Sequence, residues 1–284
     1  MTAHDAPISG LSRKLESLTV RRHEHVAEVT LTGTGPGNLM GPSFWRELPL
    51  VFGAIDDDAN IRAVVFVGEG KHFSYGLDLA AMLPEWSYVL EGQARAGPRM
   101  RFLEQIRTLQ TAVGSLADCR KPVVTAIGGW CVGGGMDVIA AADIRVAAAD
   151  AKFSIRQTKL GVVPDLGSLQ RLAAIIGDGH LRELALTGAD IDAQRAERIG
   201  LVNTVHPNRD AALAAARALA QQIASNPPLV VQGVKEILEA ERQTQLQPAL
   251  RYLSVWNAAF LPSDDLDEAI CAFEEGRDPT FQGS

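Results

Sequence analysis

Residues 121–137, "KPVVTAIGGWCVGGGMD", decide the fold. The apolar run at 123–127 predicts a buried strand, and the chain then passes through two groups of glycines into an apolar segment that predicts a helix. The glycine spacing is not G-x-G-x-x-G and no lysine follows, so neither a dinucleotide site nor a P-loop is indicated. A glycine in a helix costs roughly 1 kcal/mol relative to alanine. We therefore expect the glycines to let backbone N–H groups approach a ligand, with Gly134 at the helix N-terminus.

A second glycine turn also follows a predicted strand. The run "IRAVVFV" at 61–67 predicts a buried strand, and the chain leaves it through "GKHFSYGLDL" at 70–79, which is unusually apolar for a turn. If each turn directs one backbone N–H at the same oxygen, the two donors form an oxyanion hole. The expected donors are Leu77 and Gly134, and at Leu77 only the backbone would then matter.

Two acidic residues follow these turns closely. Asp137 is three residues beyond Gly134, on the same helical face and about one turn deeper. Asp165 is four residues beyond Gly161, in the next loop. If both carboxylates enter one pocket, burial and repulsion should raise at least one pKa. Structural alternatives remain: Asp137 as a contact between subunits, Asp165 as the cap of a helix at 167, and Asp78 as a helix cap rather than a ligand.

The composition limits the possible functions. The chain has 284 residues, a net charge of −7 and a pI near 5.4, which disfavours a nucleic-acid partner. No apolar run is long enough to span a bilayer, and the N-terminus lacks the apolar core of a secretory signal. The three cysteines form no CxxC pair, and His23 and His25 have no third ligand nearby, so neither disulfides nor a metal site are expected. These features predict a cytoplasmic location and no permanently bound cofactor.

The order of the predicted elements divides the chain into three parts. Residues 1–17 predict a loose leader, and residues 18–205 alternate between strands and helices. Residues 206–284 are almost wholly helical in pattern, with "NPP" at 226–228 as an interruption. This order predicts an α/β core followed by a helical C-terminal region.

The motifs together resemble those of the crotonase, or enoyl-CoA hydratase/isomerase, superfamily. The resemblance rests on the two glycine turns, on "AKFSIRQTKLGVVPDLGSLQRL" at 151–172 and on "FEEGRDPTF" at 273–281. "FWREL" at 44–48, Asp137 and Asp165 are most similar to the dienoyl-CoA isomerases. The resemblance implies a spiral of ββα turns and a C-terminal helical region that forms trimers, often paired into hexamers. It also implies an acyl-CoA substrate, whose coenzyme A is part of that substrate, with its thioester oxygen bound by the N–H groups of Leu77 and Gly134.

The same resemblance suggests which residues contact the acyl-CoA. Arg277 and Lys235 could reach its phosphates, although charged residues on an exposed helix are more often only solvated. The expected substrate-binding residues are Ser74, Gly76, Asp78, Leu79, Trp130, Gly133, Gln157, Leu160, Gly161 and Arg277.

Two departures from the family pattern keep several functions open. "GTGPGNLM" at 33–40 replaces the usual loop after the first hairpin, and Gln157 stands where hydratases and dienoyl isomerases usually have a glutamate. Gln157 cannot exchange a proton near neutral pH. Hydration or isomerisation of an enoyl-CoA is the main prediction, and isomerisation of a 3,5-dienoyl-CoA is the specific alternative. A non-catalytic acyl-CoA binder, or an enzyme that hydrolyses or decarboxylates an acyl-CoA, also remains possible.

Overall fold

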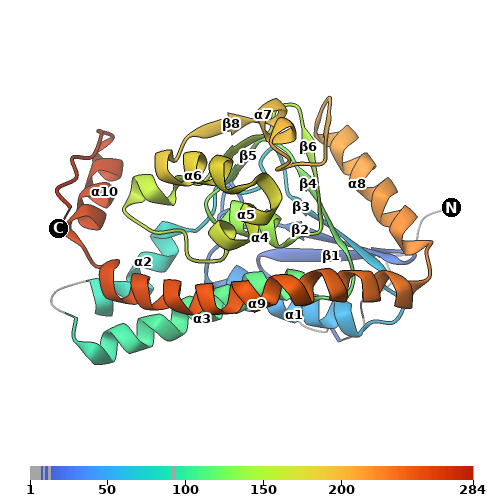
Figure 1. The fold of residues 1–284 in the computed structure, drawn as a ribbon, viewed down its shortest axis with the longest axis horizontal. Helices are drawn as coiled ribbons and strands as arrows, with labels where there is room; N and C mark the ends of the chain where they lie inside the picture. The colour runs from blue at the N-terminus through green and yellow to red at the C-terminus, as the bar shows by residue number, and fades with distance from the viewer. Residues whose placement is uncertain (1–7, 9, 12–13, 91–93, 284) are drawn as a thin grey trace.

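A mostly parallel sheet lies at the centre of the protein (Figure 1). The computed structural model describes residues 8, 10–11, 14–90 and 94–283. Within these residues, the main sheet contains six strands, in the spatial order β1 (Leu18–His23), β2 (Val26–Leu31), β3 (Ala63–Gly68), β4 (Val123–Ile127), β6 (Ile144–Ala148) and β9 (Thr204–His206). A smaller sheet beside it contains β5 (Trp130–Val132), β7 (Lys152–Ser154) and β8 (Asp190–Asp192).

The residues of the central strands explain the pairing. Every residue of β3 and β4 is buried, because these strands are apolar on both faces and are covered on both sides. β1 and β2 form an antiparallel hairpin, and each later strand of the main sheet joins its neighbour in parallel. Parallel neighbours place their carboxyl ends at one edge of the sheet, so the turns after β3 and β4 lie close together.

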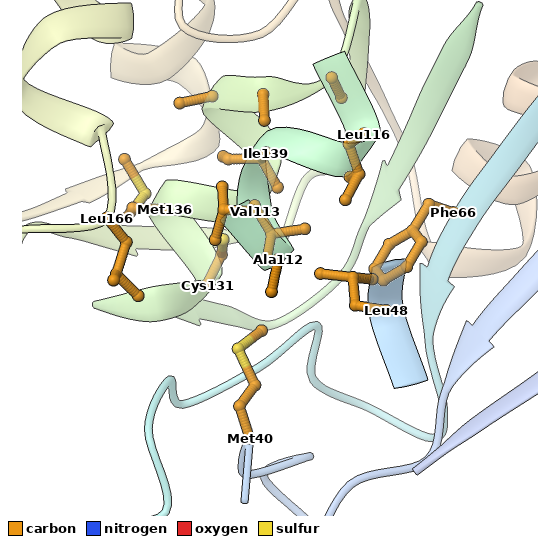
Figure 2. Packing of buried hydrophobic residues seen from close by; sticks show 14 of the residues in the cluster. Met40, Leu48, Phe66, Ala112, Val113, Leu116, Cys131, Met136, Ile139 and Leu166 are labelled. Carbon is orange, nitrogen blue, oxygen red and sulfur yellow. The ribbon is translucent and has the colours of Figure 1, made fainter. Parts of the chain in front are cut away.

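Helices cover both faces of the main sheet (Figure 1). On one face, side chains from α1, α3, α4 and the sheet form the main apolar core, and Figure 2 shows Leu48, Phe66, Val113 and Ile139 within it. The helical segments are α1 (Pro42–Asp57), α2 (Leu79–Leu90), α3 (Ala96–Asp118), α4 (Gly134–Ala141), the 3₁₀ helix η1 (Arg156–Leu160), α5 (Ser168–Ile176), α6 (Asp178–Thr187), α7 (Ala193–Arg198), α8 (Arg209–Ala224), α9 (Pro228–Phe260) and α10 (Asp264–Glu275).

The first helix after residue 206 belongs to the core. On α8, Ala212, Ala216, Ala220 and Ala224 repeat every four residues and pack as one buried face against the main sheet. Small side chains at these positions let the helix lie close to the strands. The mixed α/β architecture and the helical C-terminal region are therefore confirmed, but α8 covers the sheet instead of standing apart from it.

The N-terminal segment also differs from the loose leader that the sequence predicts. Ile8 is buried in the main core. The backbone N–H groups of Glu16 and Ser17 donate to the Glu47 carboxylate at 2.6 and 2.9 Å. Residues 1–7, 9 and 12–13 of the expected leader lie outside the described residues.

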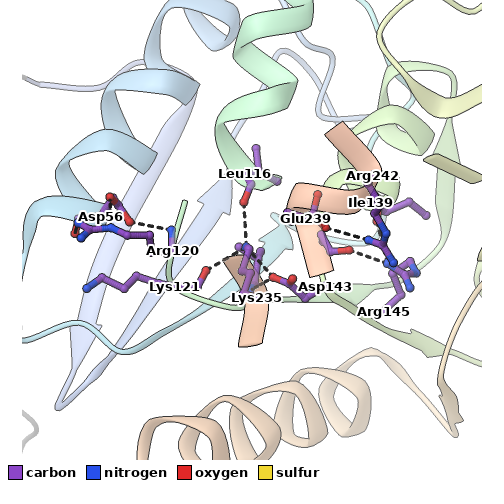
Figure 3. Close-up of polar contacts among 12 residues, drawn as sticks. Asp56, Leu116, Arg120, Lys121, Ile139, Asp143, Arg145, Lys235, Glu239 and Arg242 are labelled. Carbon is purple, nitrogen blue, oxygen red and sulfur yellow. Dashed lines mark hydrogen bonds and ion pairs between the residues drawn. The ribbon is translucent and has the colours of Figure 1, made fainter. Parts of the chain in front are cut away.

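A buried lysine fixes α9 to the end of α3 and to the start of β6 (Figure 3). The Lys235 ammonium donates to the carbonyls of Leu116 and Lys121 at 3.2 and 3.3 Å and to Asp143 Oδ2 at 2.8 Å. Its side chain is only 5% exposed, and each of the three N–H donors of the ammonium has a protein partner. The expectation that Lys235 could reach a phosphate of the substrate is wrong, because the surrounding helix ends enclose it.

Lys235→Met should destabilise the protein by about 3 kcal/mol. The methionine fills most of the space, but it leaves two carbonyls without their donor, and the Asp143 carboxylate keeps the Val123 N–H but loses its positive partner. Chemical denaturation would measure the loss in the free energy of unfolding. Lys14→Met, at an exposed lysine, is the matched control, and equal stability of the two variants would contradict this role.

Candidate functional site

The two glycine turns touch each other. In the first turn, the buried Ser74 hydroxyl donates to the Asn38 carbonyl at 2.8 Å and accepts from the Gly76 N–H at 2.9 Å. Gly76 has φ +89°, and a Cβ at this position would lie 2.8 Å from the Val132 carbonyl oxygen and 3.0 Å from the Gly134 nitrogen. Only glycine permits both this backbone conformation and this approach.

The second turn leads directly into α4. Gly133 precedes the helix with φ +54° and ψ −116°, and Gly134 is the first helical residue. A Cβ on Gly134 would lie 3.7 Å from the Leu77 nitrogen, so the structure brings the two expected donors together. Within the described residues, neither the Leu77 N–H nor the Gly134 N–H donates a hydrogen bond. Both groups therefore remain available to an acceptor.

Asp137 lies in the first turn of α4 and is fully buried. Its Oδ1 accepts the backbone N–H of Ser168, the first residue of α5, at 2.8 Å, and its Oδ2 accepts from Gln157 Nε2 at 3.3 Å. Burial raises the pKa of Asp137 to about 7; the bonds from Ser168 oppose this rise, the charge of Asp165 adds to it and Arg171 opposes it. The side chain is thus poised to exchange a proton near neutral pH.

Asp165 is held by residues from two other helices. Asn257 Nδ2, on α9, donates to Asp165 Oδ2 at 2.8 Å, and Gln110 Nε2, on α3, donates to the Asp165 carbonyl at 2.7 Å. Burial raises the pKa of Asp165 to about 6, and the bond from Asn257 opposes the rise. The capping alternative for Asp165 is wrong, because Asp137 accepts the first N–H of α5.

Neither Asn257 nor Gln110 is predicted from the sequence. Asn257 is 92 residues from Asp165 along the chain, so no local motif links the two. The available signal was an amide side chain within the otherwise apolar "SVWNAAF" at 254–260. Both side chains are buried, Asn257 at 1% and Gln110 at 7% exposure, and buried amides need partners.

Gln157 joins η1 to Asp137. Its Nε2 donates to the Asp137 carboxylate, whereas its buried Oε1 has no partner among the described residues. The amide group also faces Gly133, since a Cβ at that glycine would lie 3.9 Å from it. Gln157 therefore holds one oxygen of the Asp137 carboxylate, and its own Oε1 remains available to accept a hydrogen bond.

The remaining expected binding residues are distributed around this centre. Asp78 Oδ1 accepts the Ala81 N–H at 3.1 Å, which is the helix-capping role that the sequence favoured over a role as a ligand. Trp130 is half-buried, with the Lys152 ammonium 5.1 Å from its ring centre. Leu79 begins α2, and Leu160 and Gly161 form the end of η1, which packs against α10. Arg277 is already paired with Glu268 and Glu275, whose carboxylates raise its pKa.

Within the described residues, no group of three or more His, Cys, Asp or Glu side chains could hold a metal ion. A search of the same residues finds no helix with the length and apolar character needed to cross a membrane.

Comparison with known proteins agrees with this geometry. The family described as "Enoyl-CoA hydratase/isomerase" matches residues 21–284. The chain belongs to this family. It is an enzyme of the hydratase/isomerase type that acts on a coenzyme A thioester, as the sequence predicted.

Several members of the enoyl-CoA hydratase/isomerase family are similar to this chain over most of its length. The mitochondrial Delta(3,5)-Delta(2,4)-dienoyl-CoA isomerase of Dictyostelium discoideum is 42% identical over 260 residues, which cover 90% of this chain and 87% of that protein. The peroxisomal protein of the same name from Arabidopsis thaliana is 36% identical over 244 residues, or 86% of this chain and 88% of that protein. A solved enoyl-CoA hydratase/isomerase from Xanthobacter autotrophicus Py2 superposes with a TM-score of 0.82 at 26% identity, covering 93% of this chain and 95% of that one.

These relatives contradict the cytoplasmic location predicted from the sequence. Their names place them in mitochondria or peroxisomes. The prediction of a cytoplasmic location failed because it rested on two features only. The lack of a secretory signal argues against secretion, and the lack of a long apolar run argues against insertion in a membrane, but neither bears on import into an organelle. Signals for import into organelles have a different composition and are not detected by apolar length.

Asp137→Asn should stabilise the protein at about pH 8 while removing its activity. Because the pKa of Asp137 is about 7 in the folded protein and 3.8 ordinarily, the carboxyl favours folding most below 3.8 and loses this contribution as the pH rises through 7. A neutral asparagine avoids burying the charge, a gain on the order of 1–4 kcal/mol at about pH 8.

Chemical denaturation of wild type and variant at about pH 5 and about pH 8 would measure this gain. The control is Asp57→Asn, at an exposed aspartate. A gain that is the same at both pH values would contradict the raised pKa of Asp137 in the folded protein.

Proposed function

We propose that this enzyme isomerises a 3,5-dienoyl-CoA to a 2,4-dienoyl-CoA. The observation that carries the proposal is the pair of acids, Asp137 and Asp165, with pKa values of about 7 and 6, together with the two free backbone N–H groups that the glycine turns bring together. The similarity to proteins named Delta(3,5)-Delta(2,4)-dienoyl-CoA isomerase supports it. Isomerisation moves a proton along the acyl chain, which requires acid–base groups and no additional reactant, so we expect no permanently bound cofactor.

The N–H groups of Leu77 and Gly134 bind the thioester oxygen in this proposal. Removal of the proton beside the thioester carbonyl places negative charge on that oxygen. Two positioned donors stabilise this charge more than they stabilise the neutral thioester, and one such donor is typically worth ~2.7–4 kcal/mol. The position of Gly134 at the N-terminus of α4 adds the favourable end of a helix dipole.

The two acids divide the proton transfer. Asp165, with the lower pKa, is the base that accepts the proton from the carbon next to the carbonyl. Asp137, in its acid form, donates a proton to the far end of the conjugated system. The pair ends the reaction with one proton, now on the other carboxyl, and exchange between them or with water restores the starting state.

Gln157 separates this proposal from hydration. Addition of water needs one group to take a proton from water and another to supply one to the α-carbon, and Gln157 can do neither. Its Nε2 instead binds Asp137 Oδ2, so we assign it to holding the acid in place.

The proposed reaction gives a product of unchanged mass with a new chromophore. Incubation of the enzyme with 3,5-dienoyl-CoA and with trans-2-enoyl-CoA, followed by mass and absorbance, distinguishes the possibilities. A product that gains one water in place of the isomer would overturn the proposal in favour of a hydratase. Absence of turnover with every ester would overturn it in favour of a binder.

Two substitutions test the roles of the acids. Asp165→Asn keeps the shape but removes the base, so turnover should fall ~100-fold or more with nearly intact acyl-CoA binding. Gln157→Glu introduces the family's usual acid and should raise hydration of a simple enoyl-CoA. An Asp165→Asn enzyme that turns over as fast as wild type would show that Asp165 is not the base.

We also propose that the enzyme assembles as a trimer or a dimer of trimers. The support is a stripe of aromatic side chains on α9: Tyr252, Trp256 and Phe260 are 69%, 41% and 61% exposed. Neighbouring rings along the stripe lie 6.3 and 4.8 Å apart, so they form one continuous apolar surface. Exposed apolar surfaces of this kind commonly mark contacts with another protein.

Trp256→Glu should weaken this assembly. A carboxylate in the middle of the aromatic stripe would have to lose its hydration in the contact. Sedimentation at micromolar concentration should show trimers or hexamers for wild type and smaller species for the variant. Leu50→Glu, at an exposed leucine of α1, is the control, and a wild-type protein that sediments only as a monomer would exclude the assembly.

A further inference from the structure

A cavity lies between α3, α5 and α9. It is open on one side and has a volume of about 500 Å³, and in Figure 1 α3 and α9 run side by side along the edge that contains it. None of the proposed catalytic residues lines it. Its lining residues are Arg107, Gln110, Thr111, Gly114, Asp118, Arg171, Gln243, Gln247, Leu250 and Arg251.

The charge of this lining is opposite to that of the whole chain. Three arginines and one aspartate line the cavity, a formal balance of +3 − 1 = +2, on a chain of net charge −7. The negative charge of Asp118 offsets little of this positive charge, because burial raises the pKa of Asp118 and its Oδ1 already accepts from Gln243 at 3.2 Å. A concave site with this balance concentrates anions near the guanidinium groups.

Arg171 is the buried member of the three. It is 9% exposed, forms no ion pair with any described residue, and its Nε has no hydrogen-bond partner among them. Nη1 makes one long contact, 3.5 Å, with the Leu166 carbonyl. Burial lowers the pKa of Arg171, and the charges of Asp137, Glu239 and Asp118 oppose that lowering, but none of these carboxylates pairs with it directly. Its Nε therefore still lacks an acceptor, which a bound anion would supply.

The other two arginines are free to move toward an anion. Arg251 is exposed and forms no ion pair within the described residues. Arg107 contacts Glu104 at 2.9 Å, but both side chains are largely exposed, and such surface pairs contribute little. Guanidinium groups bind phosphate oxygens through two parallel hydrogen bonds, which a chloride ion cannot reproduce.

We propose that this cavity binds a small multivalent oxyanion of the phosphate class. Arg171 supplies the buried contact, and Arg107 and Arg251 close over the exposed side. The polar side chains of Gln247 and Thr111 complete the lining. The same phosphate chemistry occurs in free phosphate and in a lipid headgroup, and the experiment below separates the two.

Titration calorimetry of the full-length protein with inorganic phosphate, at constant ionic strength in chloride, tests the site. We expect one saturable binding event per chain, weakened about tenfold by Arg251→Gln and by Arg107→Gln, since a hydrogen-bonded charge contributes on this order. Both substituted residues are exposed, so the variants should fold. Arg198→Gln, on α7 and outside the cavity, is the matched control and should bind as wild type does.

Cosedimentation with phosphatidylcholine vesicles, with and without phosphatidic acid, gives the source of the phosphate. Binding to the acidic vesicles that is lost in Arg251→Gln assigns a lipid headgroup, and binding of inorganic phosphate alone assigns a free anion. The proposal is overturned if millimolar phosphate gives no saturable heat. It is equally overturned if Arg251→Gln and Arg107→Gln both bind phosphate as tightly as Arg198→Gln does.

Discussion

The close contact between the two glycine turns is the constraint on which the site depends. Gly76 packs directly against the Val132 carbonyl and the Gly134 nitrogen, at distances that a side chain would block. This contact brings the end of β3 and the start of α4 to one place, with Leu77 beside Gly134. Asp137 then follows one helical turn behind. A larger residue at Gly76 would separate the two backbone donors before it disturbed any acidic residue.

Burial of the Asp137 carboxyl beside this contact lowers the stability of the folded protein. Asp137 is fully buried, and its ionised form is opposed by the low polarity around it, which is why its pKa rises to about 7. The N–H of Ser168 and the amide of Gln157 compensate for only part of that cost. A hydrophobic residue would suit the interior better, so folding alone does not account for a carboxyl at this point, whereas the proton transfer that we propose for it would.

Much of the fold follows from local patterns in the sequence, but the long-range contacts do not. The buried strands and the glycine turns are visible because apolar runs and glycine spacing are short-range features. The sequence also indicated Asp137 and Asp165. It could not show that Asn257 holds Asp165, or that Lys235 is enclosed at Asp143, since those partners meet only after α9 has packed. The alanine face of α8 was missed because small side chains give a weak apolar signal.

Helix α9 contacts parts of the protein that lie far apart in the sequence. On its inner side, Lys235 and Asn257 bind the end of α3, the start of β6 and the loop that carries Asp165. On its outer side, Trp256, adjacent to Asn257 in sequence, belongs to the exposed aromatic stripe. The hydrogen bond from Asn257 thus ties Asp165 to the same helix that carries the exposed aromatic stripe. The position of Asp165, which we propose as the base, therefore depends on a C-terminal helix to which we assign no step of the reaction.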